Sequence, residues 1–166
     1  MGDYRKLHVW RRARVFSYEI VKLVDRLSLR DRIRVGSQLS RAAESIRFNI
    51  VEGCGLNTDP LMAVHVRRAL GSANEVDDQL ESLRELGSLR STDLWLIDEV
   101  REIRSMLASL LRRLEADIAQ KRHTRRKKRK SQAIALRFGP RGTERRIQKR
   151  ARPSAAPFRF AEDFSC

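Results

Sequence analysis

The residues with the clearest chemical potential are the cations gathered after residue 120. The stretch 121–130 reads KRHTRRKKRK, so eight of its ten side chains are lysine or arginine. Such side chains neutralise phosphate groups and release the counterions that surround a nucleic acid. The residues expected to contact phosphates are Lys121, Arg122, Arg125, Arg126, Lys127, Lys128, Arg129 and Lys130. The pattern therefore predicts electrostatic nucleic-acid binding with a steep dependence on salt.

The positive charge of the whole chain is concentrated in the same region. The 166 residues carry a formal net charge of +15 at pH 7. Residues 1–120 contain 20 Lys and Arg against 18 Asp and Glu, whereas residues 121–166 contain 16 against 3. Any inference of nucleic-acid binding from the overall charge therefore concerns residues 121–166 only. Phe138, Phe158 and Phe160 lie among these cations, and nucleic-acid bases can stack on such rings.

Two other interpretations of the segment 121–166 stay open. It can be a solvated appendage without a specific partner, because a dense run of like charges repels itself and resists compaction. It can also be an extension without a selected role, since GC-rich DNA encodes arginine, alanine and proline in any reading frame.

A second set of polar residues recurs at helical spacing in the first part of the chain. Its members are three or four positions apart and therefore share one helix face. They are Gln38, Arg41, Ser45, Asn49 and Glu52. The apolar residues Ile46 and Ile50 lie beside them, and buried amides or carboxylates need hydrogen-bond partners. The stripe is either a solvated helix face or a buried polar seam between helices or between subunits.

No catalytic constellation is visible in the sequence. The glycine fingerprints of nucleotide-binding loops are absent, and His8, His65 and His123 have no neighbouring ligand at metal spacing. The cysteines, Cys54 and Cys166, are far apart, which argues against a disulfide framework and favours the cytosol. We therefore expect no enzyme activity, no metal and no cofactor. No apolar stretch approaches the length of a membrane span, so a cytoplasmic protein without membrane contact is expected.

Four amphipathic segments would position these residues. Apolar side chains recur every three or four positions over about 4–27, 33–52, 58–87 and 91–119. Long helices joined by short links favour an up-down-up-down four-helix bundle. The predicted fold is therefore all-α, with a four-helix bundle over residues 1–120 and a disordered, basic, low-order C-terminal tail over residues 121–166. The last helix has room to continue into the basic run.

Caps and glycines mark the expected helix ends. Asp3 is a candidate N-cap of the first helix and Thr58 or Asp59 of the third, because their side chains can accept from free amides of a first helical turn. Gly53 and Gly55 are expected to end the second helix, since glycine reaches the left-handed conformation of a helix end. Gly71 lies within the third helix, where the close approach of a neighbouring helix would explain it.

Several short motifs occur in order along the predicted helices. They are LHVW at 7–10, RAAESI at 41–46, NIVEG at 49–53, ALGSANE at 69–75 and LGSL at 86–89. Over about residues 3–118 they resemble the bacterial 23S rRNA-intervening-sequence protein family, whose signature reads RAAxSIxxNIAEG. The resemblance marks as motif residues Arg41, Ser45, Asn49, Glu52 and Gly53.

This resemblance implies a bundle that assembles as a ring-like homopentamer and has no known enzyme activity. Some members of the family are encoded within inserts in ribosomal RNA genes. Relatives serve as accessory variability proteins of diversity-generating retroelements, where they bind a reverse transcriptase and nucleic acid. The partners implied are therefore further copies of the chain, RNA or DNA, and a reverse transcriptase.

Two functional hypotheses follow. In the first, the protein is a non-enzymatic, oligomeric bundle that binds nucleic acid electrostatically; RNA is the expected ligand, and DNA stays open. Several basic tails on one oligomer would then raise the affinity through their high local concentration. In the second, it is a protein-interaction scaffold or accessory subunit, for example of a retroelement reverse transcriptase, and the surface of the bundle carries the function.

Overall fold

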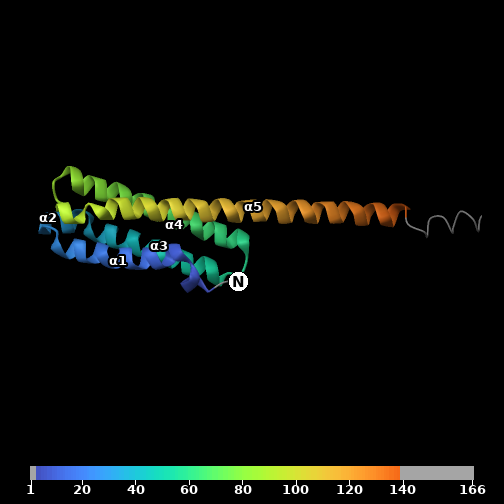
Figure 1. Cartoon of the computed structure of the whole chain (residues 1–166), viewed down its shortest axis with the longest axis horizontal. Helices are drawn as coiled ribbons and strands as arrows, with labels where there is room; N and C mark the ends of the chain where they lie inside the picture. Colours follow the sequence, from blue (N-terminus) through green and yellow to red (C-terminus); the bar gives the residue numbers. More distant parts are fainter. Residues whose placement is uncertain (1–2, 139–166) are drawn as a thin grey trace, which may run out of the picture. The chain divides into compact units, whose positions relative to one another are not determined.

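The computed structural model describes residues 3–138, and within that range it contains helices and turns but no β-strand (Figure 1). The chain divides into two compact units, residues 1–121 and residues 122–166. In chain order the elements are η1 (Tyr4–Lys6), α1 (His8–Arg26), α2 (Leu29–Asp31), η2 (Arg32–Gly36), α3 (Ser37–Gly55), α4 (Asp59–Glu85), η3 (Ser91–Asp93) and α5 (Trp95–Phe138). The all-α prediction is confirmed.

The first unit is an up-down-up-down bundle of α1, α3, α4 and the part of α5 that ends at residue 121 (Figure 1). α3 packs against both α1 and α4. Ion pairs join α5 to its neighbours, from Arg12 of α1 to Glu99 and from Asp77 of α4 to Arg104. The predicted four-helix bundle is therefore confirmed.

The core of the bundle consists of the predicted apolar stripes. The large side chains that are fully buried include Phe16, Ile20 and Leu23 of α1, Leu39, Ile46 and Ile50 of α3, Val66, Leu80 and Leu83 of α4, and Leu96, Ile103 and Leu107 of α5. Burying one such side chain contributes roughly 1.5–3 kcal/mol, whereas an exposed ion pair contributes about 0–1 kcal/mol. Aliphatic packing therefore dominates the stability of the bundle. Each helix within residues 3–138 is too short or too polar to cross a lipid bilayer.

Asp3 and Thr58 both act as N-caps, although Asp3 caps the short 3-10 helix η1 and not the first long helix, α1, which begins at His8. The carboxylate of Asp3 accepts a hydrogen bond of 3.0 Å from the amide of Arg5 and so caps η1. The hydroxyl of Thr58 accepts one of 3.4 Å from the amide of Leu61 and so caps α4. Both bonds satisfy amides that lack an acceptor in the first helical turn.

The prediction that the second helix ends at Gly53 and Gly55 is confirmed in position, because Gly55 is the last residue of α3, but not in mechanism. Neither glycine has a positive φ, and the chain leaves the helix through Leu56 and Asn57, the latter with a φ of 54°. Asparagine tolerates this left-handed conformation better than most residues. Gly53 serves packing instead, because a Cβ atom there would lie 2.6 Å from the Sδ atom of Met62 on α4. The absent side chain thus lets α3 and α4 approach closely.

The expectation for Gly71 is wrong within the protomer. A Cβ atom at Gly71 would meet no heavy atom within 4 Å, and the residue is exposed on α4. The helical period shows that a glycine lies inside a helix, but it does not show whether that glycine lies on the face that packs against a neighbouring helix. The close approach expected at Gly71 therefore occurs one helix earlier, at Gly53.

The short link between α1 and α3 contains ordered helical turns of its own. The hydroxyl of Ser28 accepts from the amide of Asp31 (3.2 Å) and caps α2, which leads through the π-helical turn η2 into α3. The carboxylate of Asp31 also accepts a hydrogen bond of 2.8 Å from Ser88. This bond ties the α1–α3 connection to the α4–α5 connection at the same end of the bundle.

α5 extends through the basic run to Phe138, so regular structure persists well beyond residue 120. The low-order tail expected from residue 121 is therefore corrected for 121–138, where the last helix continues as the sequence allowed. Lysine, arginine, glutamine and alanine are good helix formers, and none of residues 121–138 is glycine or proline. The expectation of disorder for residues 139–166 concerns a segment outside the described residues.

Candidate nucleic-acid interface

Most of the predicted phosphate-contacting residues lie together on the helical part of the second unit. Every residue from 122 to 136 is exposed. Five of the cations follow helical spacings of three or four residues and share one face, which we call the basic stripe: Arg122, Arg125, Arg126, Arg129 and Lys130. The same five residues and Lys128 line one shallow hollow beside the helix. Lys127 does not line this hollow.

Lys121 differs from the other cations because it belongs to the first unit. Its ammonium group donates to the carboxylate of Asp59, in the first turn of α4. The hydrogen bond to Asp59 and the negative charge of that carboxylate raise the pKa of Lys121 above its ordinary value. Lys121 is therefore already engaged by an acid, whereas residues 122–138 contain no Asp or Glu.

The density of positive charge on the helix matches that of phosphates on one strand. Residues 122–130 span about 12 Å at a rise of 1.5 Å per residue. Along the axis of a DNA duplex one strand contributes a phosphate about every 3.4 Å, so roughly four phosphates of one strand fall within this axial length. Like charges three or four positions apart destabilise a helix, and a bound polyanion would remove that repulsion. The geometry thus suits a phosphate backbone lying along the basic stripe.

The polar stripe of α3 forms a hydrogen-bonded seam with α4. The hydroxyl of Ser72 donates to the hydroxyl of Ser45 (2.9 Å), and the amide of Gln38 donates to the carboxylate of Glu75 (2.7 Å). The amide of Asn49 donates within α3 to the carbonyl and the hydroxyl of Ser45, at 2.9 and 3.1 Å. On this side the seam between helices, rather than the solvated face, is the interpretation that the structure favours.

The outer members of the stripe have a different environment. Arg41 and Glu52 are exposed, and Arg41 donates from Nε to the carbonyl of Ser37 (3.3 Å). Arg41 borders one shallow hollow with Ser45 and Ser72, and Glu52 borders another with His65. Gly53 is buried against α4, as described above. The five motif residues therefore divide between helix packing and an exposed margin.

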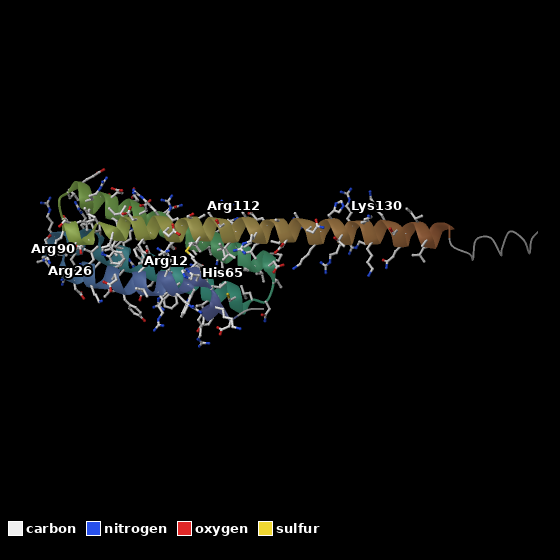
Figure 2. All side chains as sticks on the ribbon, viewed as in Figure 1. Arg12, Arg26, His65, Arg90, Arg112 and Lys130 are labelled. Atoms are coloured by element: carbon white, nitrogen blue, oxygen red, sulfur yellow. The ribbon has the colours of Figure 1, made fainter. Side chains whose placement is uncertain are left out.

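His65 belongs to this seam, although the polar stripe predicted from the sequence did not contain it. The residue is only 9% exposed, and its Nδ1 atom lies 3.3 Å from both Asn49 Oδ1 and Glu52 Oε2 (Figure 2). A signal for it exists in the sequence, because polar residues on α4 recur every three or four positions: His65, Arg68, Ser72, Glu75 and Gln79. This second stripe faces the first.

The other residues considered for chemistry are dispersed. His8 and His123 are exposed on α1 and α5. Burial, with the nearby charge of Asp3, raises the pKa of the Cys54 thiol and so disfavours its reactive thiolate. Cys166 lies outside the described residues. Within residues 3–138 no group of three His, Cys, Asp or Glu side chains is placed to hold a metal ion.

Comparison with known proteins agrees with the motifs. The model of the family described as 23S rRNA-intervening sequence protein matches residues 5–109, which is more than half of the 166-residue chain. No curated protein matches the chain. The matched range ends before the basic run, so that run lies outside what the family model describes.

Proposed function

The chain belongs to the 23S rRNA-intervening sequence protein family, and from this premise we propose that it is a non-enzymatic, oligomeric, cytoplasmic nucleic-acid-binding protein. RNA is the favoured ligand because the family takes its description from ribosomal RNA genes. The bundle provides a stable platform, and the helix beyond residue 121 provides the phosphate contacts.

The observation that carries this proposal is the basic stripe. Its five cations share one face of a helix, all are exposed, and no carboxylate occurs between residues 122 and 138. Cations arranged in this way release condensed counterions from a phosphate backbone, which drives binding without base specificity. We therefore expect binding that tolerates many sequences and weakens steeply with salt.

Oligomerisation would strengthen this binding. We propose a homopentamer, on the strength of the family resemblance, and five basic stripes would then act on one RNA through a high effective concentration. Multi-angle light scattering of the full chain tests this step. We expect a mass five times that of the 19.3 kDa protomer, and a monomeric mass would contradict the assembly.

The binding step is tested with two variants that lose equal charge. The stripe variant carries Arg122→Gln, Arg125→Gln, Arg126→Gln and Arg129→Gln, and glutamine preserves helix propensity. The control variant removes four exposed arginines of the bundle, with Arg30→Gln, Arg68→Gln, Arg112→Gln and Arg113→Gln. Affinity for a fluorescently labelled RNA hairpin is measured by anisotropy at about 0.1 M salt, with the full chain in each case.

The two variants separate a localised interface from general positive charge. We expect the stripe variant to lose on the order of 100-fold in affinity and the control variant only about threefold. Equal losses in the two variants, or no loss in the stripe variant, would contradict the proposed interface.

A specific observation favours a second candidate function, that of a protein-interaction scaffold. Five large apolar side chains are between 42% and 76% exposed at the end of the bundle where the two connections are joined: Leu29, Ile33, Leu86, Leu94 and Trp95. Arg26 and Arg90 mark this end in Figure 2. Exposed apolar clusters often mark protein-binding surfaces, and an accessory subunit of a reverse transcriptase would use one.

The scaffold function predicts a surface that is separable from RNA binding. A variant with Ile33→Lys and Trp95→Lys would abolish co-purification of a tagged full chain with a reverse transcriptase from its host and leave hairpin affinity unchanged. Co-purification that survives these changes would contradict this candidate.

A further inference from the structure

A cluster of aromatic and arginine side chains occupies the start of the first unit. The rings of Tyr4 and Trp10 meet edge to face, with centroids 4.9 Å apart. The guanidinium of Arg5 lies 4.9 Å from the centroid of Tyr4, and that of Arg14 lies 5.8 and 5.9 Å from Trp10 and Tyr18. We call these five residues the Arg–aromatic cluster.

The cluster is denser in cation–π pairs than ordinary packing requires. Such pairs occur about once per 70–80 residues in proteins, whereas residues 4–18 contain three. A further pair lies on α3, which packs against α1, with the Arg47 guanidinium 4.2 Å from the centroid of Phe48. This concentration of planar groups calls for an explanation beyond the stability of the bundle.

The charge around the cluster is strongly positive. Arg5, Lys6, Arg11 and Arg14 are all exposed, and Asp3 is the single carboxylate among residues 3–18. Arg12 does not add to this surface, because it turns toward α5 and binds Glu99 with hydrogen bonds of 2.8 and 2.5 Å. Over residues 3–19 these four exposed cations therefore compare with two carboxylates, Asp3, which lies 3.7 Å from Arg5, and Glu19, which pairs with Lys22.

Trp10 packs against the core at partial burial, whereas Tyr18 and Arg14 of the cluster are not needed to fill it. α1 turns Val9, Ala13 and Phe16 inward, and these are at most 4% exposed. Tyr18, in contrast, is 49% exposed, and Arg14 is exposed beside it. One ring and one guanidinium plane thus remain accessible to a ligand from solvent.

We propose that the Arg–aromatic cluster binds single-stranded nucleic acid, with one or two unpaired bases stacked on Tyr18 and Arg14 and the adjacent phosphates held by Arg11 and Lys6. Aromatic rings and arginine planes hold the unstacked bases of single strands, which a duplex keeps covered. This inference rests on the proposed function and adds a second contact, selective for single strands, to the electrostatic one on the basic stripe.

The binding is followed through Trp10 itself. The chain has two tryptophans, and Trp95→Phe leaves Trp10 as the sole reporter. This reporter form of the full chain is titrated with a 12-nucleotide oligouridine, with a 12-base-pair RNA duplex, and with polyglutamate of equal charge. We expect oligouridine to quench Trp10 emission at concentrations about tenfold lower than the other two polyanions require. Equal quenching by polyglutamate would show a general anion-binding surface and overturn the proposal.

Two substitutions at one exposed position test stacking. Tyr18→Leu keeps apolar area and loses the ring, whereas Tyr18→Phe keeps the ring. We expect Tyr18→Leu to weaken oligouridine binding about tenfold and Tyr18→Phe to leave it within twofold. Equal affinities of the two variants would overturn the proposal, and circular dichroism verifies that both are folded.

Tyr18→Leu and Tyr18→Phe are also introduced into the stripe variant, so that failure of this inference can be distinguished from failure of the proposed function. If the basic stripe is not an interface, the stripe variant binds oligouridine as the wild type does, and the Tyr18 comparison is still read in full. If the Arg–aromatic cluster is not a site, Tyr18→Leu and Tyr18→Phe bind oligouridine with equal affinity, both in the wild-type chain and in the stripe variant. The lower affinity caused by the stripe substitutions is then still measured.

Discussion

A Cβ atom placed on Gly53 would lie 2.6 Å from the Sδ atom of Met62 and 3.0 Å from the Cβ atom of His65. The backbone of α3 therefore depends on a missing side chain to lie against α4. Gly71 provides the opposite case on the neighbouring helix, since a Cβ atom there would meet nothing within 4 Å.

These two glycines predict opposite effects of the same substitution. Gly53→Ala should destabilise the protein by about 1 kcal/mol, because overpacking of about 1–3 kcal/mol exceeds the roughly 1 kcal/mol gained in helix propensity. Gly71→Ala should stabilise it by about 0.5–1 kcal/mol, because only the propensity gain remains. Urea unfolding of both variants measures the difference, and changes of the same sign would contradict this description of the α3–α4 contact.

Substitution of Asn49 tests how much the polar seam contributes to the free energy of unfolding. Asn49→Ala would remove its hydrogen bonds to Ser45 and its contact with His65 at a cost of about 0.5–1.5 kcal/mol, because Ser45 keeps its bond from Ser72 and His65 its contact with Glu52. Arg41→Ala on the exposed margin of the same stripe is the control, with an expected change within about 0.5 kcal/mol. Thermal unfolding compares them, and a larger loss for Arg41→Ala would mean that the stripe acts mainly through its exposed margin.

The sequence alone predicts the bundle but not which residues meet across it. Strong apolar periodicity identifies the four helices and nearly every core position, since burial of one face follows from the period of the helix. The seam partners Ser72 and His65 were missed because the relative register of two helices is a tertiary property that the period of one helix does not contain. The close approach expected at Gly71 occurs at Gly53 for the same reason.

The end of the last helix was a different problem. Charge repulsion predicted loss of structure after residue 120, whereas the helix propensity of lysine, arginine, glutamine and alanine favoured continuation. The structure shows that propensity prevails as far as Phe138. The basic stripe could not be foreseen without this helix, because eight cations in an irregular chain share no face.

Asp31 predicts a pH dependence of stability. Hydrogen bonds from Ser88 and Ser28 to its carboxylate lower the pKa of Asp31 below the ordinary value. The charged form is thus favoured in the folded state, and its contribution is present above the unfolded pKa of about 3.9 and lost as pH falls through the folded value. The free energy of unfolding should therefore decrease below about pH 4 through this group.

Ser88→Ala isolates this effect at the joined connections. The variant should raise the pKa of Asp31 toward its ordinary value, which a carbon-13 NMR titration of the carboxyl group measures directly. The difference in stability between wild type and variant should be larger at pH 6 than at pH 3. A difference that does not change with pH would show that the Ser88 hydroxyl does not stabilise the charged carboxylate.

We expect Lys121 and Lys128 to contribute unequally to the salt dependence of RNA binding, although both are lysines of α5. Lys121 already donates to Asp59, whereas Lys128 borders the hollow beside the basic stripe. Lys128→Gln should make the salt dependence of RNA binding shallower by about 0.7–0.9 in the slope of log Kobs against log salt, and Lys121→Gln by clearly less. Filter binding at four salt concentrations determines both slopes, and equal changes would contradict the distinct environment of Lys121.

The salt dependence of RNA binding by the full chain tests the central claim most directly. About four phosphates along the basic stripe predict a slope of about −3 in log Kobs against log salt for each bound protomer. The stripe variant should give a slope closer to zero than about −1, while the four-arginine control variant keeps the wild-type value. Identical slopes for the wild type and the stripe variant would contradict a phosphate-binding role for this helix.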